Sequence, residues 1–232
     1  SGTDLVLTIG GKNTNIELKL NRQAQFGSFM VNKKGGEYGY ASGISGLKEK
    51  LPSLHEELQN QLNSEKHKKA VREYVNKAKS IAKEFNAFFE YNETNNTLKT
   101  TKQVFEQLAA DGFLKKTNLN IKKDSKGNLL NEDLINLLYN NKDVNYIEIG
   151  GKGLYYLGEN KNNLPIPKLE GNTSLFIRNT YNQIGKTGLY QSLTRAFIKL
   201  DTNIVDSNIS FADVATIEDS LNQIADNVIT EK

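Results

Sequence analysis

The first part of the chain has a pattern that leaves few ways to fold. Residues 2 to 27, GTDLVLTIGGKNTNIELKLNRQAQFG, alternate apolar and polar side chains on both sides of a Gly-Gly pair. Successive side chains of a strand point to opposite faces, so this alternation predicts an antiparallel hairpin with one apolar face. A shift of one residue would set leucines against charged side chains, so the pattern determines which residues share a face.

The polar face of this hairpin is expected to gather three charged residues. With a loop at 10–13, Asp4 is predicted to lie opposite Lys19, and Val6 opposite Glu17. Neighbouring carboxylates repel each other unless a cation lies between them, and Mg²⁺ prefers such oxygen ligands. A lysine beside them can position the attacking water or stabilise charge that develops on a phosphate.

At these residues the sequence resembles the PD-(D/E)XK nuclease superfamily, which includes restriction endonucleases. The shared pattern is an Asp at the start of one strand and a Glu-x-Lys on the adjacent strand, here Asp4 and Glu17-Leu18-Lys19. The resemblance implies a restriction-endonuclease-like core in which Asp4, Glu17 and the carbonyl of Leu18 hold Mg²⁺, with Mn²⁺ as a possible substitute. It also implies that Lys19 assists the attacking water.

The same resemblance makes two glutamines beyond the lysine candidates for holding the motif or touching DNA. They are Gln23 and Gln25. Other candidate DNA contacts are Lys33, Lys34 and Tyr38 in a glycine-rich loop over 33–46.

A predicted helix is rich in lysine and could follow a DNA backbone through residues such as Lys69 and Arg72. A basic helix can equally be a solvated amphipathic helix, and a loop tyrosine can simply anchor its loop. The histidines, His55 and His67, are expected to be exposed on helices.

Composition narrows the chemistry. The 232 residues include no Cys and two His, which excludes disulfides and thiol catalysis and disfavours a histidine-rich metal site. Any metal is therefore expected to be a hard cation held by carboxylates. The net charge of +3 is compatible with nucleic acid without pointing to it. Neither a membrane span nor a signal peptide is recognised, so a cytoplasmic protein of a bacterium or phage-infected cell is expected.

Along the chain, strands, helices, further strands and a final helix predict a mixed α/β (α+β) protein. We expect a single domain over 1–232, with a helical region at about 53–140 between N-terminal strands (3–32) and C-terminal antiparallel strands (144–200). The predicted helices cover about 53–62, 64–89, 101–111, 131–140 and 211–229, and the later strand pairs cover 145–158 and 174–200.

Together these features predict a Mg²⁺-dependent DNA endonuclease, of restriction type or encoded by a phage. A restriction-type role would imply a homodimer with two sites. The alternative is a non-enzymatic α/β module that binds nucleic acid or protein, in which the first hairpin only exposes charges to water.

Overall fold

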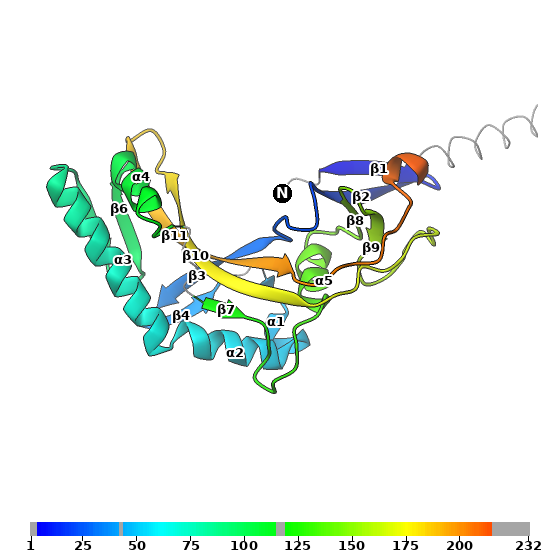
Figure 1. Cartoon of the computed structure of the whole chain (residues 1–232), viewed down its shortest axis with the longest axis horizontal. Coiled ribbons are helices and arrows are strands. Elements are labelled where there is room, and N and C mark those ends of the chain that lie inside the picture. The colour runs from blue at the N-terminus through cyan, green and yellow to red at the C-terminus, as the bar shows by residue number, and fades with distance from the viewer. Residues whose placement is uncertain (1–3, 42–43, 115–118, 215–232) are drawn as a thin grey trace, which may run out of the picture. The chain divides into compact units, whose positions relative to one another are not determined.

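The computed structural model describes residues 4–41, 44–114 and 119–214 (Figure 1). The helices are α1 (Leu47–Lys50), α2 (Pro52–Leu62), α3 (Glu65–Glu84), α4 (Lys102–Ala110) and α5 (Asp133–Asn140). The strands are β1 (Leu5–Ile9), β2 (Lys12–Lys19), β3 (Ser28–Lys34), β4 (Glu37–Tyr40), β5 (Phe89–Asn92), β6 (Thr97–Thr101), β7 (Leu119–Ile121), β8 (Tyr146–Ile149), β9 (Gly153–Tyr156), β10 (Thr173–Gln183) and β11 (Leu189–Leu200). The predicted mixed α/β class is confirmed.

The chain divides into two compact units. Unit 1 contains Ser1–Phe26, Asn131–Thr173 and Leu200–Lys232, and unit 2 contains Gly27–Leu130 and Ser174–Lys199. The single domain expected over 1–232 stays a prediction.

Unit 1 is built on a mixed four-stranded sheet in the order β1-β2-β8-β9. The β1–β2 and β8–β9 pairs are antiparallel, whereas β2 and β8 run parallel. A parallel pair requires a crossover connection, and here the chain passes through Gly27–Leu130 of unit 2 and then through α5 before it forms β8. One face of the sheet buries Ile9, Ile16 and Leu154 in an apolar cluster.

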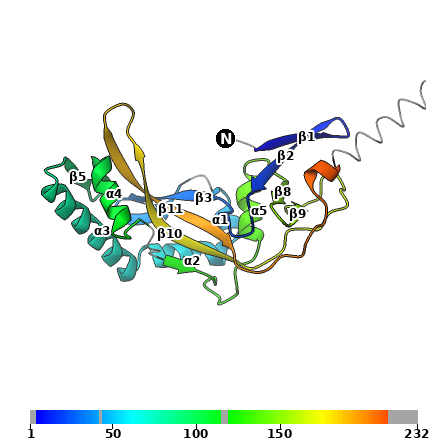
Figure 2. The ribbon, with the colours of Figure 1, turned by 45° about the horizontal axis from the view of Figure 1, so that its top comes forward.

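Unit 2 contains a seven-stranded antiparallel sheet. Five strands follow the order β4-β3-β11-β10-β7, and β6 pairs with another part of β11 and carries β5 at its outer edge. One face packs against helices: Tyr38 on β4 meets His67 of α3, and the hydroxyls of Tyr74 on α3 and Ser192 on β11 are 3.0 Å apart. Figure 1 and Figure 2 show α2 along this sheet.

The predicted apolar face of the first hairpin is confirmed over Leu5, Leu7, Ile9 and Ile16, which are buried or half-buried. It is wrong at the end of β2, where Leu18 and Leu20 are 38% and 87% exposed while the Glu17 and Lys19 side chains are largely buried.

The predicted register of the hairpin is wrong by two residues. Ile9 pairs with Lys12 and Leu5 pairs with Ile16, so the loop consists of Gly10 and Gly11 alone. Both glycines have positive φ, 56° and 75°, as the two-residue type I′ turn requires. A two-residue shift keeps every side chain on its face, while the predicted opposition of Asp4 to Lys19 and of Val6 to Glu17 is lost.

The region expected to be helical over 53–140 also contains β5, β6 and β7. The helix predicted to reach Phe89 stops at Glu84, and Asn86 adopts a left-handed conformation with φ 49°. Asparagine tolerates this conformation, which terminates helices. The glycine-rich stretch 33–46 is not entirely a loop, because β4 forms within it through a Gly35-Gly36 turn.

The helices predicted near 101–111 and 131–140, and the later strand pairs, are confirmed as α4, α5 and the strands β8 to β11. The predicted closing helix is helical over 211–214, and the remainder of 211–229 lies outside the described residues. None of the described helices has the length and apolar character that crossing a membrane requires.

Candidate functional site

The hairpin register brings two carboxylates to the same place. Extending the observed pairs by one position sets Asp4, just before β1, opposite Glu17 on β2. Opposite residues on one face of an antiparallel pair have their Cβ atoms about 4.5–5.5 Å apart. The Asp4 carboxylate turns toward β2 and its Oδ2 accepts a hydrogen bond of 3.0 Å from the backbone N–H of Leu18. The observed register therefore brings Asp4 nearer to Glu17 than the predicted register would.

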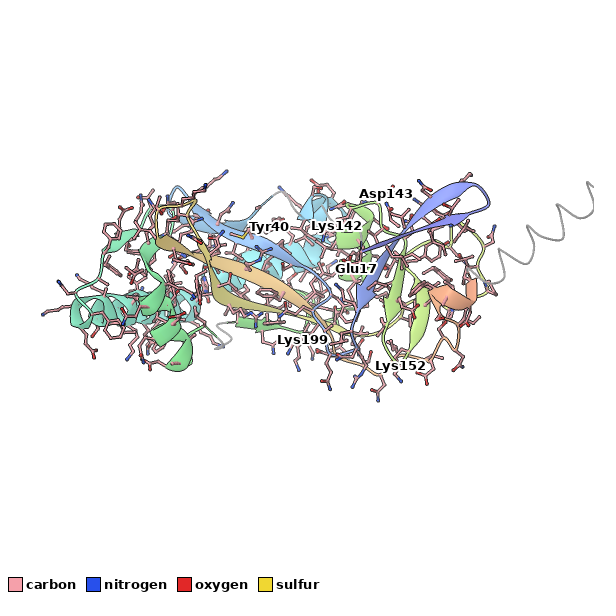
Figure 3. The ribbon with its side chains drawn as sticks, turned by 90° about the horizontal axis from the view of Figure 1, so that it is seen from above. Glu17, Tyr40, Lys142, Asp143, Lys152 and Lys199 are labelled. Atoms are coloured by element: carbon pink, nitrogen blue, oxygen red, sulfur yellow. The ribbon has the colours of Figure 1, made fainter. Side chains whose placement is uncertain are left out.

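Glu17 is held by two partners. The Lys19 ammonium forms an ion pair with its Oε1, and the Tyr139 hydroxyl of α5 donates to the same oxygen at 3.2 Å. The Lys19 Nζ also lies 5.8 Å from the centre of the Tyr139 ring. The side chains of Glu17 and Lys19 are only 12% and 14% exposed, so this pair is largely shielded from solvent. Figure 3 shows Glu17 on β2, with Lys142 and Asp143 beyond the end of α5.

Tyr139 is a member of the site that the sequence did not single out. Burial, followed by the negative charges of Glu17 and Asp4, raises the pKa of Tyr139 well above its usual value. The hydroxyl therefore stays protonated and remains a hydrogen-bond donor to Glu17 at any ordinary pH. Spacing within 131–140 marks an apolar stripe, but it gives no signal that one tyrosine of this helix meets a strand acid.

The site offers few metal ligands, and all of them are oxygen atoms, which suit a hard cation. Among the described residues, no group of three or more His, Asp or Glu side chains is arranged to hold a metal ion. The candidate ligands are thus the carboxylates of Asp4 and Glu17 and one backbone oxygen. The N–H and C=O of a strand residue point to the same edge, so the Leu18 carbonyl is directed to the β1 side, where Asp4 lies. Three oxygen donors of this kind are compatible with Mg²⁺ that keeps several waters.

The polar surface of unit 1 extends beyond this cluster. A hollow of about 530 Å³ is lined by polar and charged residues of 12–15, 143–145 and 159–162. Asn15, which shares the β2 face of Glu17, donates from Nδ2 to the Asp143 carbonyl at 3.1 Å. A ligand that follows this face of β2 would therefore meet amide groups next to the charged cluster.

The two glutamines predicted to assist the site follow β2 in the same unit. Gln23 is exposed and Gln25 is half-buried. The backbone N–H of Gln23 donates to Asn21 Oδ1 at 2.9 Å, which shapes the turn after β2. Their proposed contact with DNA stays a prediction.

The remaining candidate DNA contacts belong to unit 2. Tyr38 is 4% exposed and packs edge-on against His67, with ring centres 4.9 Å apart, so the prediction of an accessible loop tyrosine is wrong. His67 is also buried, contrary to expectation, and neither ring nitrogen has a hydrogen-bond partner among the described residues. Because β4 lies over the start of α3, both rings become part of the core.

The four basic candidates remain at the surface, but most have local partners. Lys33 donates to the Glu93 carbonyl at 3.0 Å, whereas Lys34 is exposed at the end of β3. Lys69 lies 4.0 Å from Glu73, and Arg72 lies 3.7 Å from Glu65. These exposed pairs of α3 are typical of a solvated amphipathic helix, the alternative that the sequence left open.

Comparison with known proteins gives no relative for the chain: no protein-family model matches it, and neither does any curated protein or solved structure.

Proposed function

We propose that the chain is a Mg²⁺-dependent DNA endonuclease whose active site is the cluster of Asp4, Glu17 and Lys19. One observation carries the proposal: Asp4 is aligned opposite Glu17, with its carboxylate bonded to the Leu18 N–H, while Lys19 contacts Glu17. The resemblance to the PD-(D/E)XK superfamily assigns metal binding and water activation to these same residues.

Asp4, Glu17 and the Leu18 carbonyl would hold the metal. A bound Mg²⁺ supplies positive charge for a phosphodiester and acidifies a coordinated water. The Lys19 ammonium stabilises negative charge that develops on the phosphate and orients the attacking water. Tyr139 holds the Glu17 carboxylate in place through its hydroxyl.

The competing function is a module that binds nucleic acid or protein without cleaving it. The ion pair between Lys19 and Glu17 supports this alternative, because a satisfied pair needs no metal to stabilise the carboxylate. In the nuclease, the ammonium must release Oε1 or the metal must use Oε2. The two functions therefore differ in whether added metal changes the state of this pair.

Cleavage of supercoiled plasmid and of single-stranded DNA, with Mg²⁺, Mn²⁺ or EDTA, tests the proposal. The wild-type protein should cleave only with a metal, and Asp4→Asn, Glu17→Gln and Lys19→Ala should each lose about a hundredfold or more in rate. Glu106→Gln is the matched control, because Glu106 pairs with Lys102 on the exposed face of α4. Equal rates in all variants, or no cleavage by the wild type with either metal, would overturn the proposal.

A further inference from the structure

The sheet of unit 2 has one face that does not pack against its helices, and this face carries an unusual set of side chains. Alternate residues of β10 and β11 point to it: Phe176 and Arg178 on β10, and Arg195, Phe197 and Lys199 on β11. The intervening residues, such as Ile177 and Ala196, are fully buried on the helical side.

Two aromatic rings form the floor of this face. Phe176 and Phe197 are stacked with their ring centres 5.5 Å apart and an interplanar angle of 22°. The Arg178 guanidinium lies 4.3 Å from the centre of the Phe197 ring, and the Lys199 ammonium lies 5.0 Å from the centre of the Phe176 ring. The rings hold both cations by cation–π attraction, which leaves their N–H groups available to acceptors.

The positive charge of this face is not neutralised within its own unit. No ion pair joins Arg178, Arg195 or Lys199 to a carboxylate among the described residues of unit 2. Arg195 donates to the neutral partners Ser28 Oγ, at 2.9 Å, and Met30 Sδ, at 3.4 Å. The Arg178 Nε is buried and has no hydrogen-bond partner within the part of the chain that the structure describes. Such a face is complementary to an anion.

The spacing of the cations indicates a ligand with several charges. Arg195 and Lys199 are four residues apart on β11, a separation of about 13 Å along an extended strand. Phe197 lies between Arg195 and Lys199 on β11, and the Arg178 guanidinium lies over its ring. One phosphate cannot bridge such a row, whereas a phosphodiester backbone presents successive anionic oxygens along its length. The planar forks of two arginines also match phosphate geometry.

We propose that this basic-aromatic face, formed by Phe176, Arg178, Arg195, Phe197 and Lys199, binds the phosphodiester backbone of DNA. The choice of DNA over another polyanion rests on the proposed function, since a nuclease must hold its substrate away from the reacting phosphate as well as at it. The predicted basic helix α3 is then a secondary surface, because its cations have carboxylate neighbours.

Binding of fluorescently labelled duplex and single-stranded DNA to the full chain, measured in EDTA by anisotropy over a range of salt concentrations, tests this surface. The variants are Arg178→Gln, Arg195→Gln and Lys199→Glu, with Lys126→Gln in an exposed turn as the control and Lys69→Gln for α3. Each face variant should weaken binding and lower the slope of log K against log salt by about 1 for every phosphate contact removed.

Lys199 is exposed, so its substitution should leave the fold intact. Circular dichroism would show whether either arginine variant unfolds. Unchanged affinity and salt slope in Lys199→Glu and in the correctly folded arginine variants would overturn the proposal. Equal competition by polyglutamate of matched charge would also overturn it. EDTA prevents metal-dependent cleavage, so the binding measurement does not depend on nuclease activity. If the wild-type protein cleaves no DNA but the face variants still bind DNA more weakly, only the proposed nuclease activity is contradicted.

Discussion

The Oε1 oxygen of Glu17 accepts from two groups, the ammonium of Lys19 and the hydroxyl of Tyr139. A metal at this carboxylate competes with the ammonium and is compatible with the neutral hydroxyl. The two donors therefore have opposite effects on a bound cation, and substitutions at these two residues should separate them.

Lys19→Met removes the competing charge and keeps most of the side-chain length. We expect Mn²⁺ to bind about three- to tenfold more tightly, equivalent to roughly 1 kcal/mol for a partly shielded ion pair, while DNA cleavage is lost. Electron paramagnetic resonance of free Mn²⁺ measures the binding. Lys152→Met, which breaks the pair with Asp206, is the control in the same unit. Weaker Mn²⁺ binding in Lys19→Met than in the wild type would contradict this role.

Tyr139→Phe deletes only the hydroxyl that orients Glu17. The expected results are a loss of about 1 kcal/mol in the free energy of unfolding and a higher Mg²⁺ concentration for half-maximal cleavage. Tyr91→Phe is the matched control, because its hydroxyl donates to Asn96 at 3.0 Å in unit 2. A purely structural tyrosine would lower stability without moving the Mg²⁺ requirement, and that outcome would remove Tyr139 from the site.

At the scale of elements, the site depends on how β2 is fixed to its neighbours. The Gly10-Gly11 turn sets its register against β1, and the turn after β8 holds its other end. The Gly150 N–H donates to the Lys19 carbonyl at 2.8 Å, and a Cβ built on Gly150 would lie 2.0 Å from the Leu20 carbonyl oxygen. Glycine is therefore needed at 150 for the close approach of two backbones next to Lys19.

Gly150→Ala should lower the free energy of unfolding by about 2 kcal/mol or more, since the contact is with backbone that must move. It should also reduce cleavage by displacing Lys19. Urea unfolding and the plasmid assay measure the two effects. Gly39→Ala is the control: its nearest neighbours are side-chain atoms at 3.7 Å, so stability should change by no more than about 0.5 kcal/mol. Equal free energies of unfolding for Gly150→Ala and Gly39→Ala would show that the backbone after β2 can move aside at little cost, contrary to this prediction.

At the scale of the whole molecule, stability is expected to depend on a buried histidine. Burial lowers the pKa of His67 from 6.5 to about 4. Between these values the unfolded chain binds a proton that the folded protein does not bind. The free energy of unfolding is therefore unaffected by His67 well above pH 6.5, and it decreases as the pH falls from 6.5 toward 4.

Lowering the pH from 7 to 5 should reduce the free energy of unfolding by about 2 kcal/mol through this group. His67→Phe, which fills the site under Tyr38 without titrating, should lack that part of the pH dependence. His55→Phe is the control, since His55 is only half-buried and contacts the Tyr40 hydroxyl at 2.5 Å. Urea titrations at both pH values provide the comparison, and the same pH dependence in His67→Phe and wild type would rule out this explanation.

Local patterns were sufficient where a signal lies within a few neighbouring residues. The alternation around Gly10-Gly11 predicted the hairpin, and apolar spacing predicted α4 and α5. Local patterns failed where conformation or distant contacts decide. The loop length at 10–13 depends on two positive φ angles, and the end of α3 depends on the left-handed Asn86.

The sequence by itself determined that Asp4, Glu17 and Lys19 share the polar face of one hairpin, because side-chain direction in a strand follows from parity alone. Only the tertiary structure decided that Asp4 lies opposite Glu17, that Tyr139 reaches this carboxylate from α5, and that Arg178 and Lys199 cover two stacked rings. Glu17 and Tyr139 are separated by more than half of the chain, and Phe176 meets Phe197 across two strands. The packing of the folded chain brings such residues together, and no pattern of neighbouring residues encodes that packing.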